Sequence, residues 1–142
     1  WAHCFEGVTG IIFVASLSDY DQKMFEDETT NRMKDSVYLF RDICTNPAFA
    51  ETPIILFLNK RDLFQKKIRD VRIGGEGCFR DYDGPPNDYA AGVDYFLRYF
   101  LKQNRDPDRK VFHHVTCATD TANVQVVMDS TRAMIIQDSL NF

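Results

Sequence analysis

The sequence predicts an α/β fold, with a parallel sheet and crossover helices. Apolar segments of strand length, at 8–17, 54–58 and 111–115, alternate with longer segments whose apolar residues recur at helical spacing. Parallel strands need a connection of about a dozen residues or more, which such helices provide. With 142 residues, 44% hydrophobic and 27% charged, the chain has the size and composition of one globular domain over 1–142.

The first helix is predicted over about 29–44, after the strand at 8–17 and a polar turn at 18–21. Its apolar residues recur every three or four positions, which places them on one face and the charges elsewhere. These residues are Met33, Val37, Phe40 and Cys44. Asn46-Pro47 is expected to end the helix.

The second strand is predicted at 54–58, where five consecutive apolar residues are typical of a strand buried on both faces. The basic stretch 66–69 is expected to form a solvated helix face. The segments 74–77 and 83–87, rich in glycine and proline, are expected to be turns. The glycine cluster is not expected to hold a phosphate, because no Lys-Ser or Lys-Thr follows it.

Two further helices, over about 88–102 and 122–140, flank the third predicted strand at 111–115. Each has one apolar face, which we expect to belong to the core. In the first of these helices the face consists of Tyr89, Val93, Phe96, Leu97 and Phe100. In the last helix it consists of Val124, Val127, Met128, Thr131 and Ile135.

The motif Asn59-Lys60-Arg61-Asp62 follows the buried strand. Open α/β sheets bind ligands at that end of their strands. There the Asp62 carboxylate can accept two hydrogen bonds from an adjacent ring N–H and exocyclic amine, donors that guanine presents and adenine does not. Asn59 can bond a base edge or tie neighbouring loops together, and the methylene stem of Lys60 can lie along a ring face. The motif therefore predicts guanine recognition.

A second candidate loop follows the third strand, with the sequence Thr116-Cys117-Ala118-Thr119-Asp120-Thr121. Its small residues allow a backbone N–H to approach a ligand oxygen, and Thr-Asp-Thr can cap the following helix. Taken alone, the segment is typical of an ordinary strand-to-helix turn. After an Asn-Lys-x-Asp strand, it is predicted to be the second guanine loop, with Thr116, Cys117, Ala118 and Thr119 as candidate nucleotide-binding residues.

Four segments occur in the order found in one known family: Trp1-Ala2-His3-Cys4-Phe5-Glu6-Gly7-Val8-Thr9, Leu17-Ser18-Asp19-Tyr20-Asp21, Phe57-Leu58-Asn59-Lys60-Arg61-Asp62-Leu63-Phe64 and Thr116-Cys117-Ala118-Thr119-Asp120-Thr121. With these segments the chain resembles the α subunits of heterotrimeric G proteins. Small Ras-like GTPases share Asn-Lys-x-Asp but generally lack the Trp-x-His-Cys-Phe-Glu opening and Thr-Cys-Ala-Thr. The resemblance covers only the C-terminal part of the family's length, and implies a partial Ras-like P-loop NTPase fold with its three C-terminal strands.

The resemblance also implies a function. The complete protein would be a GTPase that binds GTP or GDP with Mg²⁺ and couples seven-helix receptors to effectors at the cytoplasmic face of the plasma membrane. Trp1, His3, Cys4 and Phe5 match the end of the switch II region, which in the family faces the βγ dimer. The first predicted helix and the loop after it match an effector-facing surface, and the last helix matches the one coupled to the receptor.

The family's phosphate loop, Gly-x-x-x-x-Gly-Lys-Ser/Thr, does not occur in this sequence. Phosphoryl transfer needs that loop, Mg²⁺ and a residue that orients water. We therefore expect a fragment that holds the base-recognising half and hydrolyses no GTP alone. The alternative is a non-catalytic interaction fragment, a decoy that binds receptor, effector or βγ without turnover. His113 and His114 would point to opposite faces of a strand, which suits neither a metal site nor a catalytic dyad.

The charge and the cysteines exclude other classes of function. A formal net charge of −4 argues against nonspecific nucleic-acid binding, for which a basic surface is expected. The cysteines have no Cys-x-x-Cys spacing, so neither a zinc ribbon nor a redox pair is predicted, and cytosolic thiols are the simpler interpretation. No segment is predicted to cross a bilayer.

Overall fold

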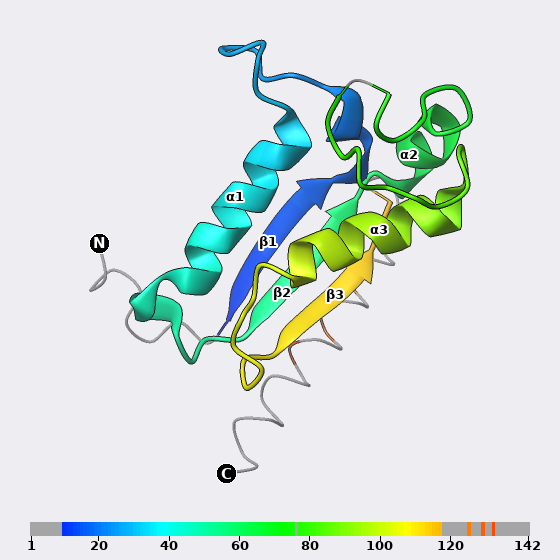
Figure 1. Cartoon of the computed structure of the whole chain (residues 1–142). Coiled ribbons are helices and arrows are strands. Elements are labelled where there is room, and N and C mark those ends of the chain that lie inside the picture. The colour runs from blue at the N-terminus through cyan, green and yellow to red at the C-terminus, as the bar shows by residue number, and fades with distance from the viewer. Residues whose placement is uncertain (1–9, 76, 118–124, 126–128, 130–131, 133–142) are drawn as a thin grey trace.

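A computed structural model describes residues 10–75 and 77–117 and the single positions 125, 129 and 132 (Figure 1). The last predicted helix, over 122–140, lies outside these residues except at those three positions. The described elements are β1 (Ile11–Ser16), the 3₁₀ helix η2 (Leu17–Asp21), α1 (Arg32–Thr45), the 3₁₀ helix η3 (Pro47–Phe49), β2 (Ile54–Asn59), α2 (Arg61–Lys67), α3 (Tyr89–Leu101) and β3 (Val111–Val115).

The three strands form one parallel sheet in the order β1-β2-β3. Ile54 of β2 lies opposite Ile11 of β1 and Val111 of β3. Helices α1 and α3 lie over one face of this sheet (Figure 1). The predicted α/β fold, a parallel sheet with crossover helices, is therefore confirmed for the described part of the chain.

Side chains of β2 enter two separate apolar clusters because successive residues of a strand point to opposite faces. Leu56 and Leu58 belong to the main core, which lies between the sheet and the helices α1 and α3. Ile55 and Phe57 pack with Phe112 on the other face. All five residues of the apolar run are buried, as the sequence predicted for a strand covered on both sides.

The first helix begins three residues later than predicted, and local hydrogen bonds explain the difference. The carboxylate of Asp27 accepts hydrogen bonds from the hydroxyls of Thr29 and Thr30, which holds these residues in a turn of their own. The side chain of Asn31 then accepts a hydrogen bond from the backbone N–H of Lys34 at 3.0 Å, as an N-cap does. Helix α1 therefore starts at Arg32.

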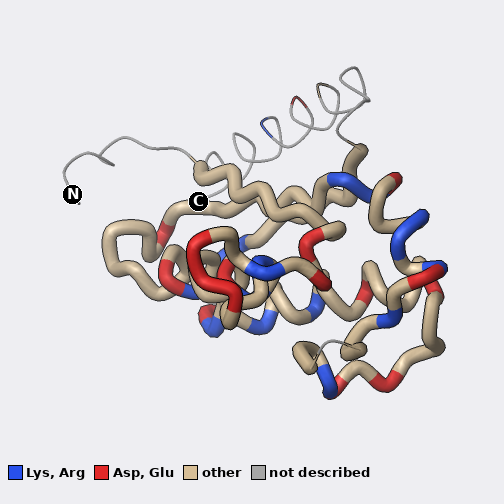
Figure 2. Tube along the Cα trace, turned by 90° about the horizontal axis from the view of Figure 1, so that it is seen from above, with Lys and Arg blue, Asp and Glu red and all other residues tan. Residues whose placement is uncertain are grey.

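Charged residues are absent from the three strands, and Figure 2 shows the Lys, Arg, Asp and Glu residues on the helices and connecting segments. The predicted first strand, 8–17, is shorter in the structure, because Leu17 begins the helix η2 and is fully buried there. Val8 and Thr9 lie outside the described residues. No described helix is both long enough and apolar enough to span a membrane.

Candidate functional site

Within the Asn-Lys-Arg-Asp motif, a single residue, Lys60, connects β2 to α2. Asn59 ends β2, and Asp62 lies in the first turn of α2. Lys60 between them has φ = 59°, the left-handed conformation that few residues other than glycine adopt. Such strained residues persist only where neighbouring contacts hold them, and they cluster at functional sites. This turn keeps Asp62 at the carboxyl end of the sheet.

Three hydrogen bonds join the motif and the preceding Leu58 to Thr116, the first residue after β3. The backbone N–H of Arg61 donates to the carbonyl of Thr116 at 3.1 Å, and the N–H of Thr116 donates to the carbonyl of Leu58 at 2.9 Å. The hydroxyl of Thr116, a buried residue, donates to Oδ1 of Asn59 at 3.1 Å. Asn59 therefore ties the two loops together, and its second predicted role, a contact with the base edge, stays a prediction.

The Asp62 carboxylate has one oxygen suited to an external donor. Its Oδ1 is buried and has no hydrogen-bond partner within the described part of the chain. Burial raises the pKa of this carboxyl, but hydrogen bonds from the N–H of Leu63 and the side chain of Cys117 lower it more, so that the pKa lies below its usual value. At neutral pH the site thus presents a negatively charged acceptor. The N–H and amine of guanine fit this acceptor, since an unpaired buried carboxylate oxygen is costly.

Five of the predicted nucleotide-binding residues come together at the carboxyl ends of β2 and β3: Asn59, Lys60, Asp62, Thr116 and Cys117. The other predicted site residues lie outside the described residues: Ala118 and Thr119 of the second loop, and Trp1, His3, Cys4 and Phe5 of the proposed βγ surface. The last helix, predicted to couple to a receptor, also lies there apart from the three positions named above.

The basic stretch 66–69, at the C-terminal end of α2, differs from its prediction. Lys66 and Arg69 are exposed, as expected of a solvated face. Ile68, in contrast, is buried in the core, and Lys67 is partly buried. The ammonium group of Lys67 forms an ion pair with Asp21 at 2.8 Å. The prediction was wrong for Ile68 because this residue lies on the buried face of the helix end, and wrong for Lys67 because its side chain pairs with a residue distant in the sequence. The buried face could have been inferred from the i, i+4 spacing of Phe64 and Ile68.

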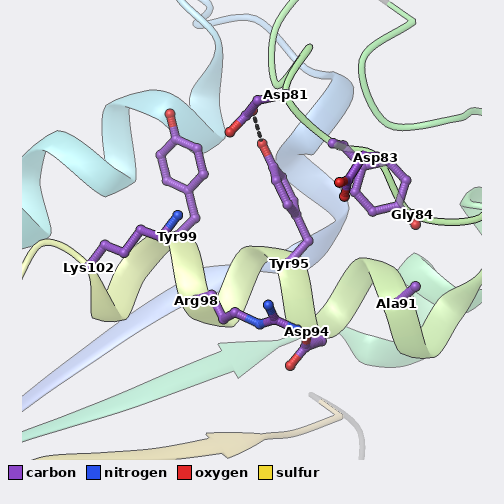
Figure 3. A pocket seen from close by; sticks show the side chains of 10 residues that line it. Asp81, Asp83, Gly84, Ala91, Asp94, Tyr95, Arg98, Tyr99 and Lys102 are labelled. Carbon is purple, nitrogen blue, oxygen red and sulfur yellow. Dashed lines mark hydrogen bonds and ion pairs between the residues drawn. The ribbon is translucent and has the colours of Figure 1, made fainter.

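A hollow of about 260 Å³ lies between α3 and the segment 81–84, and Figure 3 shows the side chains around it. The hydroxyl of Tyr95 donates to Asp81 at 2.5 Å, while Arg98 pairs with Asp94 of the same helix. Burial raises the pKa of Tyr95, and the bond to Asp81 raises it further, so that its hydroxyl remains a donor. None of the described candidate nucleotide residues lines this hollow. We therefore do not assign it to the nucleotide.

Comparison with known proteins gives two findings. The family model described as "G-protein alpha subunit" matches residues 1–135, which include both predicted guanine loops. The chain is also similar to the "Guanine nucleotide-binding protein G(o) subunit alpha" of Caenorhabditis elegans, with 46% identity over 140 residues. The match covers 99% of this chain and 39% of that relative's length.

Proposed function

The chain belongs to the G-protein α-subunit family, and on this premise we propose that it forms the base-recognising half of a guanine-nucleotide-binding signal transducer. The observation that carries the proposal is the Oδ1 of Asp62, which is buried and has no hydrogen-bond partner among the described residues. Adenine would leave this carboxylate partly unpaired, since it presents no ring N–H beside its exocyclic amine.

The proposed recognition follows from the chemistry of four side chains. The charged Asp62 accepts one hydrogen bond from the ring N–H of guanine and one from its exocyclic amine. The stem of Lys60 lies along a face of the base. The hydroxyl of Thr116 fixes the orientation of the Asn59 amide, because it donates to that amide's oxygen. Bound nucleotide would thus meet groups that are already held in place.

In the complete protein we propose GTP binding and hydrolysis with Mg²⁺. The phosphate loop that this requires is absent from the present sequence. Among the described residues, no three His, Cys, Asp or Glu side chains cluster closely enough to hold a metal ion. The proposal therefore assigns the ion to none of the described residues.

The proposed partners are those of a G-protein α subunit: the βγ dimer, a seven-helix receptor through the last helix, and effector proteins, at the cytoplasmic face of the plasma membrane. The outer surface of α1 supports the effector contact, because Tyr38 and Leu39 expose about half of their surface there, 47% and 53%. These two residues are exposed apolar side chains on the helix that matches the family's effector-facing surface.

The guanine site is tested by nucleotide competition in the complete protein that carries this chain. GDP, ADP and xanthosine diphosphate each compete with fluorescent GDP, and the concentrations for half displacement are compared. We expect GDP to be preferred over ADP by about a hundredfold or more, because a site built from buried polar groups rejects a base that leaves them unpaired. Equal competition by ADP would contradict the proposal. Release of phosphate in the presence of Mg²⁺ tests hydrolysis separately.

A further inference from the structure

We propose that Lys67 is a positioning residue for the guanine site, which holds Asp62 in place by clamping helix α2 to the turn after β1. The inference rests on the proposed guanine site and adds to it a residue that lies outside both sequence motifs. It concerns the orientation of α2, the helix whose first turn carries Asp62.

Helix α2 is too short to hold its own orientation. It has 7 residues, about two turns, and isolated helices of that length are unstable in water. Contacts at its ends must therefore set its axis. At the N-terminal end, the backbone N–H of Arg61 donates to the carbonyl of Thr116. At the C-terminal end, the buried Ile68 accepts a hydrogen bond on its carbonyl from the amide of Asn87 at 2.7 Å, and the side chain of Lys67 adds the charged contact.

The ammonium group of Lys67 reaches several groups of the same turn, η2. It donates to the backbone carbonyl of Ser18 at 2.7 Å and to Oδ1 of Asp21 at 2.8 Å. It also lies over the ring of Tyr20, 5.9 Å from the ring centre. The side chains of Lys67 and Asp21 are only 23% and 17% exposed, so this pair is better shielded from water than a surface ion pair. Charge-assisted hydrogen bonds of this kind fix geometry well.

The turn η2 also contacts α2 at its middle. The ring of Tyr20 packs edge-on against that of Phe64, with the ring centres 5.3 Å apart. The hydroxyl of Tyr20 donates to the carbonyl of Val71, just beyond the helix, at 2.5 Å. Because Phe64 is fully buried, α2 can tilt about it but cannot leave the core. Loss of the Lys67 contact would leave the C-terminal end held by fewer contacts and so favour such a tilt.

A tilt of α2 would displace Asp62. Asp62 and Lys67 are five positions apart, which corresponds to about 7.5 Å along a helix. Hydrogen bonds weaken once donor and acceptor are more than about 3.2 Å apart, so a small displacement of the carboxylate affects its bonds to the base. We expect the bond to the exocyclic amine of guanine to report this displacement.

The test compares GDP with inosine diphosphate, which lacks the exocyclic amine, in the complete protein. The dissociation constants of both are measured for the parent and for Lys67→Met. We expect the preference for GDP over inosine diphosphate to fall about two- to tenfold in Lys67→Met, the range of one hydrogen bond. Lys67→Arg keeps donors for Ser18 and Asp21 and should retain the preference. Arg69→Met removes an exposed charge nearby and serves as the matched control.

A second variant keeps the comparison informative if Lys67→Met does not fold. Asp21→Asn removes the ion pair but leaves the bond to the Ser18 carbonyl, and should lower the preference less, in the same direction. If Lys67→Met or Asp21→Asn weakens the binding of GDP and of inosine diphosphate equally, Lys67 supports only the stability of the fold and the inference is wrong. A parent protein that binds both nucleotides equally would instead contradict the guanine site itself, and the role of Lys67 with it.

Discussion

The hydroxyl of Thr116 donates a hydrogen bond to Oδ1 of Asn59 at 3.1 Å, and this bond joins the ends of β3 and β2. The backbone of Thr116 bonds in addition to Leu58 and Arg61, on either side of Asn59 and Lys60. One buried residue thus holds the strand end and the helix start that together carry the proposed guanine contacts. The spacing of the two loops depends on it.

Thr116→Val should therefore destabilise the protein and weaken GDP binding. Valine keeps the shape of threonine but donates no hydrogen bond, so Oδ1 of Asn59 loses its donor. We expect the free energy of unfolding to fall by about 1 to 2 kcal/mol, measured by urea denaturation. Thr45→Val is the matched control, since the Thr45 hydroxyl bonds to Arg41 on the exposed surface of α1. A Thr116→Val protein as stable as Thr45→Val would show that the bond contributes little.

Asp62→Asn should change the preferred base from guanine to xanthine. The asparagine amide presents a donor in place of one carboxylate oxygen, and xanthine offers a carbonyl where guanine has its amine. We expect the preference for GDP over xanthosine diphosphate to reverse, measured by competition in the complete protein. Asp70→Asn, an exposed substitution beyond α2, should leave the preference unchanged. Unchanged guanine preference in Asp62→Asn would remove Asp62 from the site.

The elements with regular apolar patterns could be predicted from the sequence. The run at 54–58 is buried on both faces, and the helical spacing of Met33, Val37 and Phe40 places all three in the core. These predictions succeed because burial of apolar surface dominates the placement of such elements. The Asn59 and Asp62 positions at the strand end follow from the same pattern.

Contacts made by charged side chains across long sequence separations could not be predicted. Arg109 is buried, and its guanidinium donates to the carbonyls of Cys44 and Phe49, at the end of α1 and in η3. Nothing in the polar segment around Arg109 indicates this, because the acceptors are backbone carbonyls some 60 residues away. Lys67 was misassigned for the same reason, since its acceptors lie in the turn η2.

Gly92→Ala in α3 should destabilise the protein, although alanine favours helices over glycine by about 1 kcal/mol. A Cβ atom at Gly92 would lie 2.8 Å from Cδ1 of Ile68 and 2.9 Å from Cζ of Phe64, and both of these side chains are buried. Overpacking of this kind costs about 1 to 3 kcal/mol, so we expect a net loss in thermal unfolding.

A double variant checks the cause of that loss. Ile68→Val removes the Cδ1 atom that the new Cβ would meet most closely. Gly92→Ala combined with Ile68→Val should therefore lose less stability than the sum of the two single variants. Strict additivity would mean that the crowding at Gly92 relaxes in some other way.

Acidification from about pH 7 to pH 5 should destabilise the protein through His114. Burial, and then the nearby His113, hold the pKa of His114 below its usual value of 6.5, and its ring lies 5.7 Å from that of Phe57. The imidazole of His114 therefore binds a proton more readily in the unfolded chain than in the folded one. Its contribution to folding stability is fully present above pH 6.5 and is lost as the pH falls through the lowered pKa of the folded state.

His114→Gln should remove most of this dependence, measured as the difference in urea unfolding free energy between pH 7.5 and pH 5. The carboxyls of Asp27 and Asp62, whose pKa values are lowered, do not interfere in this window, because their contributions are lost only as the pH falls below about 3.8. Since His113 contributes to the low pKa of His114, His113→Gln should reduce the dependence to a smaller extent. An undiminished loss of stability in His114→Gln would place the responsible group elsewhere.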